Sequence, residues 1–240
     1  MLNPNALLPD DVYDRLTGRS SVLDQRIKVD ATRWQEALRA RSLPLPVGEL
    51  VSSGWVSLSR AAVFAVADRD FTPEAALQLL WHSLAWGLGP RAPRLNARLD
   101  AIADDQDGAS KLLVKAWTSV RDGDDPETSY ALLTTPRGAG RIKWLGPAFS
   151  SKFLYFAQGQ AVAPAHLILD KVVATHLRAT AWPDAPTTAW WPVTYGAYCA
   201  LMRQWAAEAS HRSGRVVSPD EIEFAVFKGR SARRSNGATA

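Results

Sequence analysis

Two ionisable residues, Lys152 and Asp170, each stand at the start of an otherwise apolar helical segment, 18 residues apart. Lys152 is followed by Phe153, Tyr155 and Phe156, so its side chain is expected to lie against aromatic surface. Desolvation disfavours the ammonium form of a lysine, and a neutral amine is a nucleophile towards carbonyl-like carbon. The first segment therefore carries a candidate nucleophile, and the second begins with a carboxylate.

The residues around this pair predict two helices joined by a turn. The glycine and proline at 146–147 interrupt what precedes them, because proline fixes φ and has no N–H to donate. Ser150 or Ser151 can then cap a helix whose first turn holds Lys152. Asp170 comes directly before the run K-V-V-A-T-H-L-R, at a position where an aspartate can cap the second helix.

The segment G-P-A-F-S-S-K, with L-I-L-D ending 18 residues after the lysine, resembles the helix–hairpin–helix DNA glycosylase/lyase superfamily. The similarity is greatest to its 8-oxoguanine DNA glycosylase branch and covers about 40 residues, 141–178. The resemblance implies that Pro147 is the hairpin proline, Lys152 the nucleophile and Asp170 the essential carboxylate.

Several hairpin positions depart from the family pattern. Ala148 and Ser150 stand where the family has two glycines, and Phe149 replaces the small aliphatic residue between them. Glycines in such a hairpin let the backbone approach a DNA phosphate closely. Val172 stands where the 8-oxoguanine branch often has a histidine.

The chemistry that the resemblance implies is base excision from double-stranded DNA. The enzyme would flip a nucleotide out of the duplex, and Lys152 would attack its anomeric carbon to form a Schiff base. Asp170 would stabilise developing positive charge or orient the amine, and β-elimination could then nick the strand as an AP lyase does. The base would be an oxidised purine such as 8-oxoguanine, another lesion, or a modified base of phage DNA in a defence role. Neither a cofactor nor a metal is needed.

Further residues are candidates for contacts with DNA and with the flipped base. The segment 136–143 before the hairpin is basic and has no acidic residue, which suits a phosphate backbone. The candidate DNA-binding residues are Arg141, Lys143, Gly146, Pro147, Ser150 and Ser151. The candidate base-pocket residues are Phe156, Phe224 and Phe227, although aromatic residues at helical spacing are more often core.

Two readings without catalysis remain open for the pair. A lysine near a helix start is usually solvated, and an aspartate before an apolar helix is usually only a cap. The chain would then be a non-catalytic helix–hairpin–helix protein, with Lys152 on a phosphate. Alternatively, it would be a helical interaction protein that never meets DNA.

Composition limits the class of protein. The 240 residues are 47% apolar, which is enough for a sizeable core, and a net charge of +4 with a pI near 9.4 is compatible with a nucleic-acid partner. One cysteine, Cys199, and four histidines provide neither a disulfide nor a zinc motif. No stretch is long and apolar enough for a membrane span, so we expect a cytoplasmic monomer with no membrane partner.

The pattern predicts a predominantly all-α fold of roughly ten helices in one glycosylase-like domain, 1–240. Two helical subdomains are expected, with the helix–hairpin–helix at their junction. The run 57–67 is interpreted as a buried helix, and no strand pattern is convincing. The basic tail, 228–240, is expected to be disordered.

A glycine- and proline-rich turn before the middle of the chain carries Arg91, Arg94 and Arg98. It could hold phosphate through guanidinium groups, or be a loop followed by a solvated arginine face. Among the ten tryptophans, Trp144 and the pair at 190–191 are candidates for a second role at a DNA-facing surface, although packing is their commoner use.

Overall fold

The computed structural model describes residues 6–68, 71–161 and 163–235. Within these ranges the chain forms twelve α-helices and one two-stranded antiparallel sheet, which confirms the predominantly helical prediction. The helices are α1 (Asp10–Tyr13), α2 (Arg19–Leu23), α3 (Ala31–Arg39), α4 (Arg60–Val66), α5 (Pro73–Leu88), α6 (Leu95–Ala103), α7 (Gln106–Arg121), α8 (Pro126–Leu133), α9 (Pro147–Ala157), α10 (Lys171–Thr180), α11 (Pro192–Ser213) and α12 (Pro219–Ser235). The strands are β1 (Arg26–Asp30) and β2 (Trp55–Ser59).

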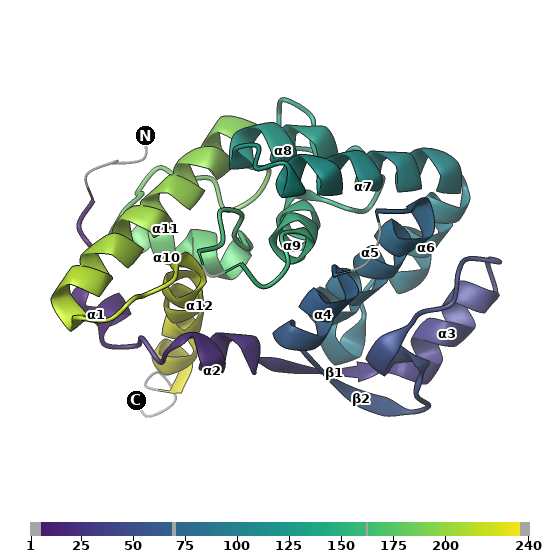
Figure 1. Cartoon of the computed structure of the whole chain (residues 1–240), viewed down its shortest axis with the longest axis horizontal. Coiled ribbons are helices and arrows are strands. Elements are labelled where there is room, and N and C mark those ends of the chain that lie inside the picture. Colours follow the sequence, from purple (N-terminus) through teal and green to yellow (C-terminus); the bar gives the residue numbers. More distant parts are fainter. Residues whose placement is uncertain (1–5, 69–70, 162, 236–240) are drawn as a thin grey trace.

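Helix α9 lies in the centre of the molecule, between two groups of helices (Figure 1). On one side α12 packs against α1, α2, α10 and α11, and on the other lie α3 to α6 with the sheet. Helices α7 and α8 connect the two groups, because α7 contacts α5 and α8 contacts α11. Buried apolar side chains from both groups belong to one hydrophobic core. The helix that carries Lys152 is therefore held from several sides.

Capping side chains set the starts of several helices. The Asp30 carboxylate accepts from the N–H of Arg33 at 3.1 Å at the start of α3. Thr72 accepts in the same way from Ala75 and is followed by a proline in the first turn of α5. Each cap satisfies a backbone N–H that has no acceptor inside its helix.

The sheet is the main difference from the sequence-based expectation. β1 and β2 pair in the register Arg26↔Ser59 to Asp30↔Trp55, and only then does α4 begin. The expected helix at 57–67 thus starts as a strand. The run V-S-L-S alternates apolar and polar residues, which suits a strand with one buried face, and Ser59 then caps α4 by accepting from Ala62 at 3.1 Å.

The C-terminal helix is also longer than expected. The basic tail was predicted to be disordered from residue 228, whereas α12 continues to Ser235. Residues 236–240 of that tail lie outside the described residues.

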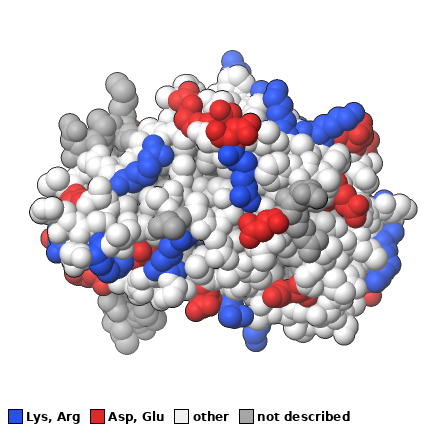
Figure 2. Space-filling view, in the orientation of Figure 1, with Lys and Arg blue, Asp and Glu red and all other residues white. Residues whose placement is uncertain are grey.

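Charge on the molecular surface is mixed. In Figure 2 the Lys and Arg side chains form separate groups among acidic ones on the face shown. The net charge of +4 therefore does not produce a continuous basic field over this face, and a polyanion would have to be held by local groups of cations. No helix among the described residues is long and apolar enough to cross a membrane.

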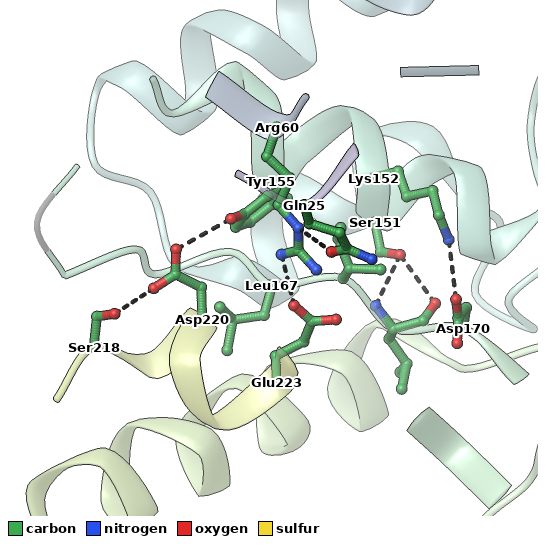
Figure 3. A network of polar contacts seen from close by, with 12 residues as sticks. Gln25, Arg60, Ser151, Lys152, Tyr155, Leu167, Asp170, Ser218, Asp220 and Glu223 are labelled. Carbon is green, nitrogen blue, oxygen red and sulfur yellow. Dashed lines mark hydrogen bonds and ion pairs between the residues drawn. The ribbon is translucent and has the colours of Figure 1, made fainter. Parts of the chain in front are cut away.

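A buried ion pair joins the two groups of helices (Figure 3). Arg60, the first residue of α4, donates from Nη1 to Glu223 Oε2 of α12 at 2.8 Å, and both side chains are 1% exposed. The Arg60 Nε donates to Gln25 Oε1 at 2.8 Å. Three aromatic rings lie about the guanidinium, with centroids 5.0–5.5 Å from its carbon: Trp86, Tyr155 and Phe224.

We expect Arg60→Met to lower the free energy of unfolding by about 3–5 kcal/mol, because Glu223 is left buried without the cation that compensates for its lost hydration. The double variant Arg60→Met/Glu223→Leu should recover part of this loss, since no buried charge then remains. Urea unfolding of the wild type and the two variants measures both effects. A double variant less stable than the single one would contradict this account.

Candidate active site

Lys152 and Asp170 lie together between the two groups of helices. The Lys152 Nζ lies 3.3 Å from Asp170 Oδ2, and the two side chains are 7% and 19% exposed (Figure 3). Lys152 projects from the second turn of α9, and Asp170 is the residue before α10. The spacing of 18 residues in sequence thus becomes a direct contact between an amine and a carboxylate.

The Asp170 carboxylate uses its two oxygens differently. Oδ1 accepts from the backbone N–H groups of Val172 at 2.9 Å and Val173 at 3.2 Å, which caps α10, while Oδ2 pairs with Lys152. Burial acts to raise the pKa of Asp170, but the Lys152 ammonium and the two N–H groups outweigh it and hold the pKa below its usual value. Asp170 is therefore an anion at neutral pH.

The segment before Asp170 is fixed by three side chains. Ser151 Oγ accepts from the N–H of Leu169 at 3.1 Å and lies 3.0 Å from its carbonyl oxygen. Tyr195 OH accepts from the Leu167 N–H and donates to its carbonyl oxygen, and Tyr198 OH donates to the Ile168 carbonyl oxygen at 2.8 Å. The bonding groups of Ser151, Tyr195 and Tyr198 are buried, so they set the position of Asp170 relative to α9.

Helix α5 makes room for the lysine. A Cβ atom placed on Gly87 would lie 2.8 Å from Lys152 Cδ, 3.2 Å from its Cε and 3.3 Å from a ring carbon of Phe149. The lysine side chain therefore passes over α5 at a point where only a hydrogen atom fits. Gly87, Tyr195 and Tyr198 were not singled out as site residues from the sequence, because their roles depend on contacts between distant segments.

The caps predicted for the first helix were wrong. Helix α9 begins at Pro147, and its N-cap is Gly146, which supplies no side-chain acceptor. Proline at the first position has no N–H that needs one, so the helix starts a turn earlier than expected. Ser150 and Ser151 lie inside the helix, 5% and 0% exposed. Their hydroxyl groups are consequently not on a surface that DNA could contact.

The other candidate residues fall into two sets. Arg141 and Lys143 are exposed, directly before the hairpin, and the backbone at 146–147 is partly exposed beside them. The aromatic candidates instead lie in or against the core. Phe156 is 0% exposed against Phe64, Trp86 and Tyr155, Phe224 is 6% exposed beside Arg60, and Phe227 is partly buried.

Among the described residues, no group of three or more His, Cys, Asp or Glu side chains is arranged to hold a metal ion.

A family model described as "Putative 8-oxoguanine DNA glycosylase OGG-like protein" matches residues 20–227. The chain belongs to this family. The match includes the hairpin, Lys152 and Asp170, and extends over both groups of helices. No curated protein and no solved structure matches at a significant level. Membership in the family supports a DNA glycosylase function and a DNA substrate.

Asp170→Asn separates the cap from the ion pair, because the asparagine oxygen can still accept from Val172 and Val173. The folded pKa of Asp170 lies below the unfolded value, so its charge stabilises the fold above the unfolded pKa, and this stabilisation is lost as pH falls through the folded pKa. We expect the variant to be about 1–3 kcal/mol less stable at pH 7. The difference should shrink below about pH 4, and urea unfolding at pH 7 and pH 3 checks it. An equal difference at both pH values would contradict the assignment.

Gly87→Ala should displace the Lys152 side chain from Asp170. Without the ammonium at 3.3 Å, the pKa of the Asp170 carboxyl should rise, which carboxyl-detected NMR titration measures. Gly146→Ala is the matched control, because a Cβ there meets nothing within 4 Å. Alanine is the better helix former by up to about 1 kcal/mol, so a general loss of fold is not expected. An unchanged Asp170 pKa in Gly87→Ala would contradict the role of Gly87.

Proposed function

We propose that this chain is a DNA glycosylase with AP lyase activity. It removes an oxidised purine through a Schiff base on Lys152, and 8-oxoguanine is the oxidised purine we favour. The single observation that supports this proposal most directly is the 3.3 Å contact between Lys152, in the second turn of α9, and Asp170, which caps α10. An amine and a carboxylate held together in a mostly buried position are the two groups that this reaction requires.

In the proposed reaction, the Lys152 nitrogen forms a bond to C1′ of a nucleotide that has been flipped out of the duplex. The glycosidic bond breaks, and its electron pair leaves with the base, which takes up a proton. Opening of the sugar then gives an imine between Lys152 and C1′. Loss of the C2′ proton and departure of the 3′ phosphate nick the strand, and hydrolysis of the imine frees the lysine.

Asp170 would act as a fixed negative charge in this sequence. Because its pKa is held low, it is ionised at neutral pH and can stabilise positive charge that develops on the sugar. Attack needs the neutral amine, so the Lys152 ammonium must first give up a proton. This proton is released to solvent, because Asp170 must remain an anion to stabilise the positive charge on the sugar.

For DNA contact we propose the exposed side chains of Arg141 and Lys143 and the start of α9 at 146–147. The start of α9 presents the positive end of the helix dipole, which favours phosphate. Ser150 and Ser151 are left out of this surface because they are buried.

Borohydride trapping tests the proposal, with duplexes that contain 8-oxoguanine, an abasic site or modified cytosines. We expect a covalent adduct with wild-type protein and with Lys115→Gln, an exposed lysine of α7. Lys152→Gln and Lys152→Arg should give none, because neither can form the imine. Asp170→Asn should trap at least about 100-fold more slowly.

An adduct that persists in Lys152→Gln would contradict the assignment of the nucleophile. Salt-dependent duplex binding without an adduct on any substrate would instead favour a monofunctional glycosylase or a non-catalytic DNA-binding protein, and would remove the nucleophilic role of Lys152. A protein that neither traps nor binds duplex DNA would contradict the proposal as a whole. Trapping only on modified cytosines would replace the oxidised purine by a modified base, as in the phage-defence hypothesis.

A further inference from the structure

A pocket of about 350 Å³ opens beside the hairpin, apart from the contact between Lys152 and Asp170. Its walls come from three separate segments: the start of α6, the hairpin residues 140–149 and the loop 187–190. Lys171, the residue after Asp170, completes the lining. The pocket therefore adjoins the candidate active site without containing its two ionisable groups, and its size is in the range of small-molecule sites.

The charged side chains that line this pocket are all cations: Arg94, Arg98 and Lys171. The larger pocket of about 590 Å³ near Trp191 differs in this respect, since Glu127 and Arg141 both line it. A concave surface with cations and no carboxylate concentrates an anion. The positive charge of its lining residues therefore favours an anionic ligand in this pocket.

Arg98 is the buried member of this group. It is 9% exposed, its Nη1 donates to the Pro93 carbonyl oxygen at 2.5 Å, and its guanidinium carbon lies 4.8 Å from the centroid of the Phe149 ring. Among the described residues, the buried Nε has no hydrogen-bond partner and no carboxylate forms an ion pair with Arg98. Burial and the neighbouring Arg94 lower the pKa of Arg98. A buried cation without a counter-charge is costly, and an anionic ligand would relieve that cost.

The pocket also presents an aromatic surface. Trp144 is 44% exposed and lies on its wall, with the Arg94 guanidinium carbon 5.1 Å from the centroid of its ring. The backbone of Trp144 has φ of 66°, a left-handed conformation that a bulky residue rarely adopts. Such strain persists only where surrounding contacts enforce it. The backbone that carries this ring is thus fixed at the wall of the pocket.

A planar ring surface beside buried and exposed cations fits a nucleotide, whose base can stack while its phosphate pairs. We propose that this pocket binds one nucleotide of the DNA, next to the nucleotide that reacts at Lys152. Its phosphate lies at Arg98 and Lys171, and its base stacks on Trp144. This site rests on the proposed function only in requiring a DNA substrate. It differs from a phosphate contact at the hairpin backbone because side chains of α6 and the ring of Trp144 form it.

Duplexes with a tetrahydrofuran abasic analogue and 2-aminopurine at each flanking position test the site. Fluorescence of 2-aminopurine reports whether that base has left the duplex stack. We expect a change at one flanking position with wild-type protein and its loss in Trp144→Ala, with affinity reduced between about 5-fold and about 100-fold. Lys171→Gln should lower the salt dependence of binding by about one counterion. Lys115→Gln, which is also exposed but lies outside the pocket, should bind as wild type.

Arg98→Gln should weaken duplex binding more than Lys171→Gln does. Circular dichroism shows whether this variant folds. If Arg98→Gln does not fold, the variants at the exposed residues Trp144 and Lys171 test the site without it. The proposal would be overturned if Trp144→Ala and Lys171→Gln both bound duplex DNA with the affinity, the salt dependence and the 2-aminopurine fluorescence of the wild type. Binding of free deoxyguanosine monophosphate that Trp144→Ala weakens, with duplex binding unchanged, would also overturn it and assign the pocket to a free nucleotide. Trapping at Lys152 is measured separately, so loss of the proposed activity would not be mistaken for loss of this site.

Discussion

The structure depends most on the placement of one carboxylate. Asp170 caps α10 with one oxygen and meets Lys152 with the other, so the start of α10 and the second turn of α9 cannot move independently. An ion pair that is mostly removed from water gains little unless further hydrogen bonds compensate for lost hydration. Here the backbone N–H groups of α10 supply them. A helix cap, which is a local feature, thus becomes the part that orients a candidate reaction centre.

The surroundings of this pair are arranged to keep it in place. Ser151, Tyr195 and Tyr198 bind the backbone of residues 167–169 and leave it little freedom. Gly87 leaves space for the lysine methylenes on the opposite side. The catalytic geometry of an enzyme is sensitive to shifts of about 1 Å, and such supporting contacts hold reacting groups within that tolerance. Residues far apart in sequence therefore act together to position Lys152 and Asp170.

The sequence predicts the features that depend on residues close together in the chain, and it misses those that depend on contacts between distant residues. The two helices and the Asp170 cap depend on neighbouring residues, and these predictions agree with the structure. The resemblance alone singled out Lys152 and Asp170 together, and their contact is what the structure adds. The serine caps were wrong because glycine and proline can start a helix without a capping side chain. The strand β2 was missed because a five-residue strand that leads directly into a helix has little periodicity of its own. The burial of Phe156 and of Arg60 depends on tertiary packing, which no local sequence pattern contains.

The pairing of Arg60 with Glu223 also has a consequence for the order of assembly. The strands, α3 to α8 and α9 precede α12 in the chain, so during synthesis they can pack while Arg60 has no carboxylate to meet. Domains generally fold as their segments leave the ribosome, and a cation without its partner resists burial. The aromatic surroundings of Arg60 can close only when α12 arrives. Since α10 packs on α12 and carries the Asp170 cap, we expect the candidate reaction centre to be among the last parts of the molecule to become ordered.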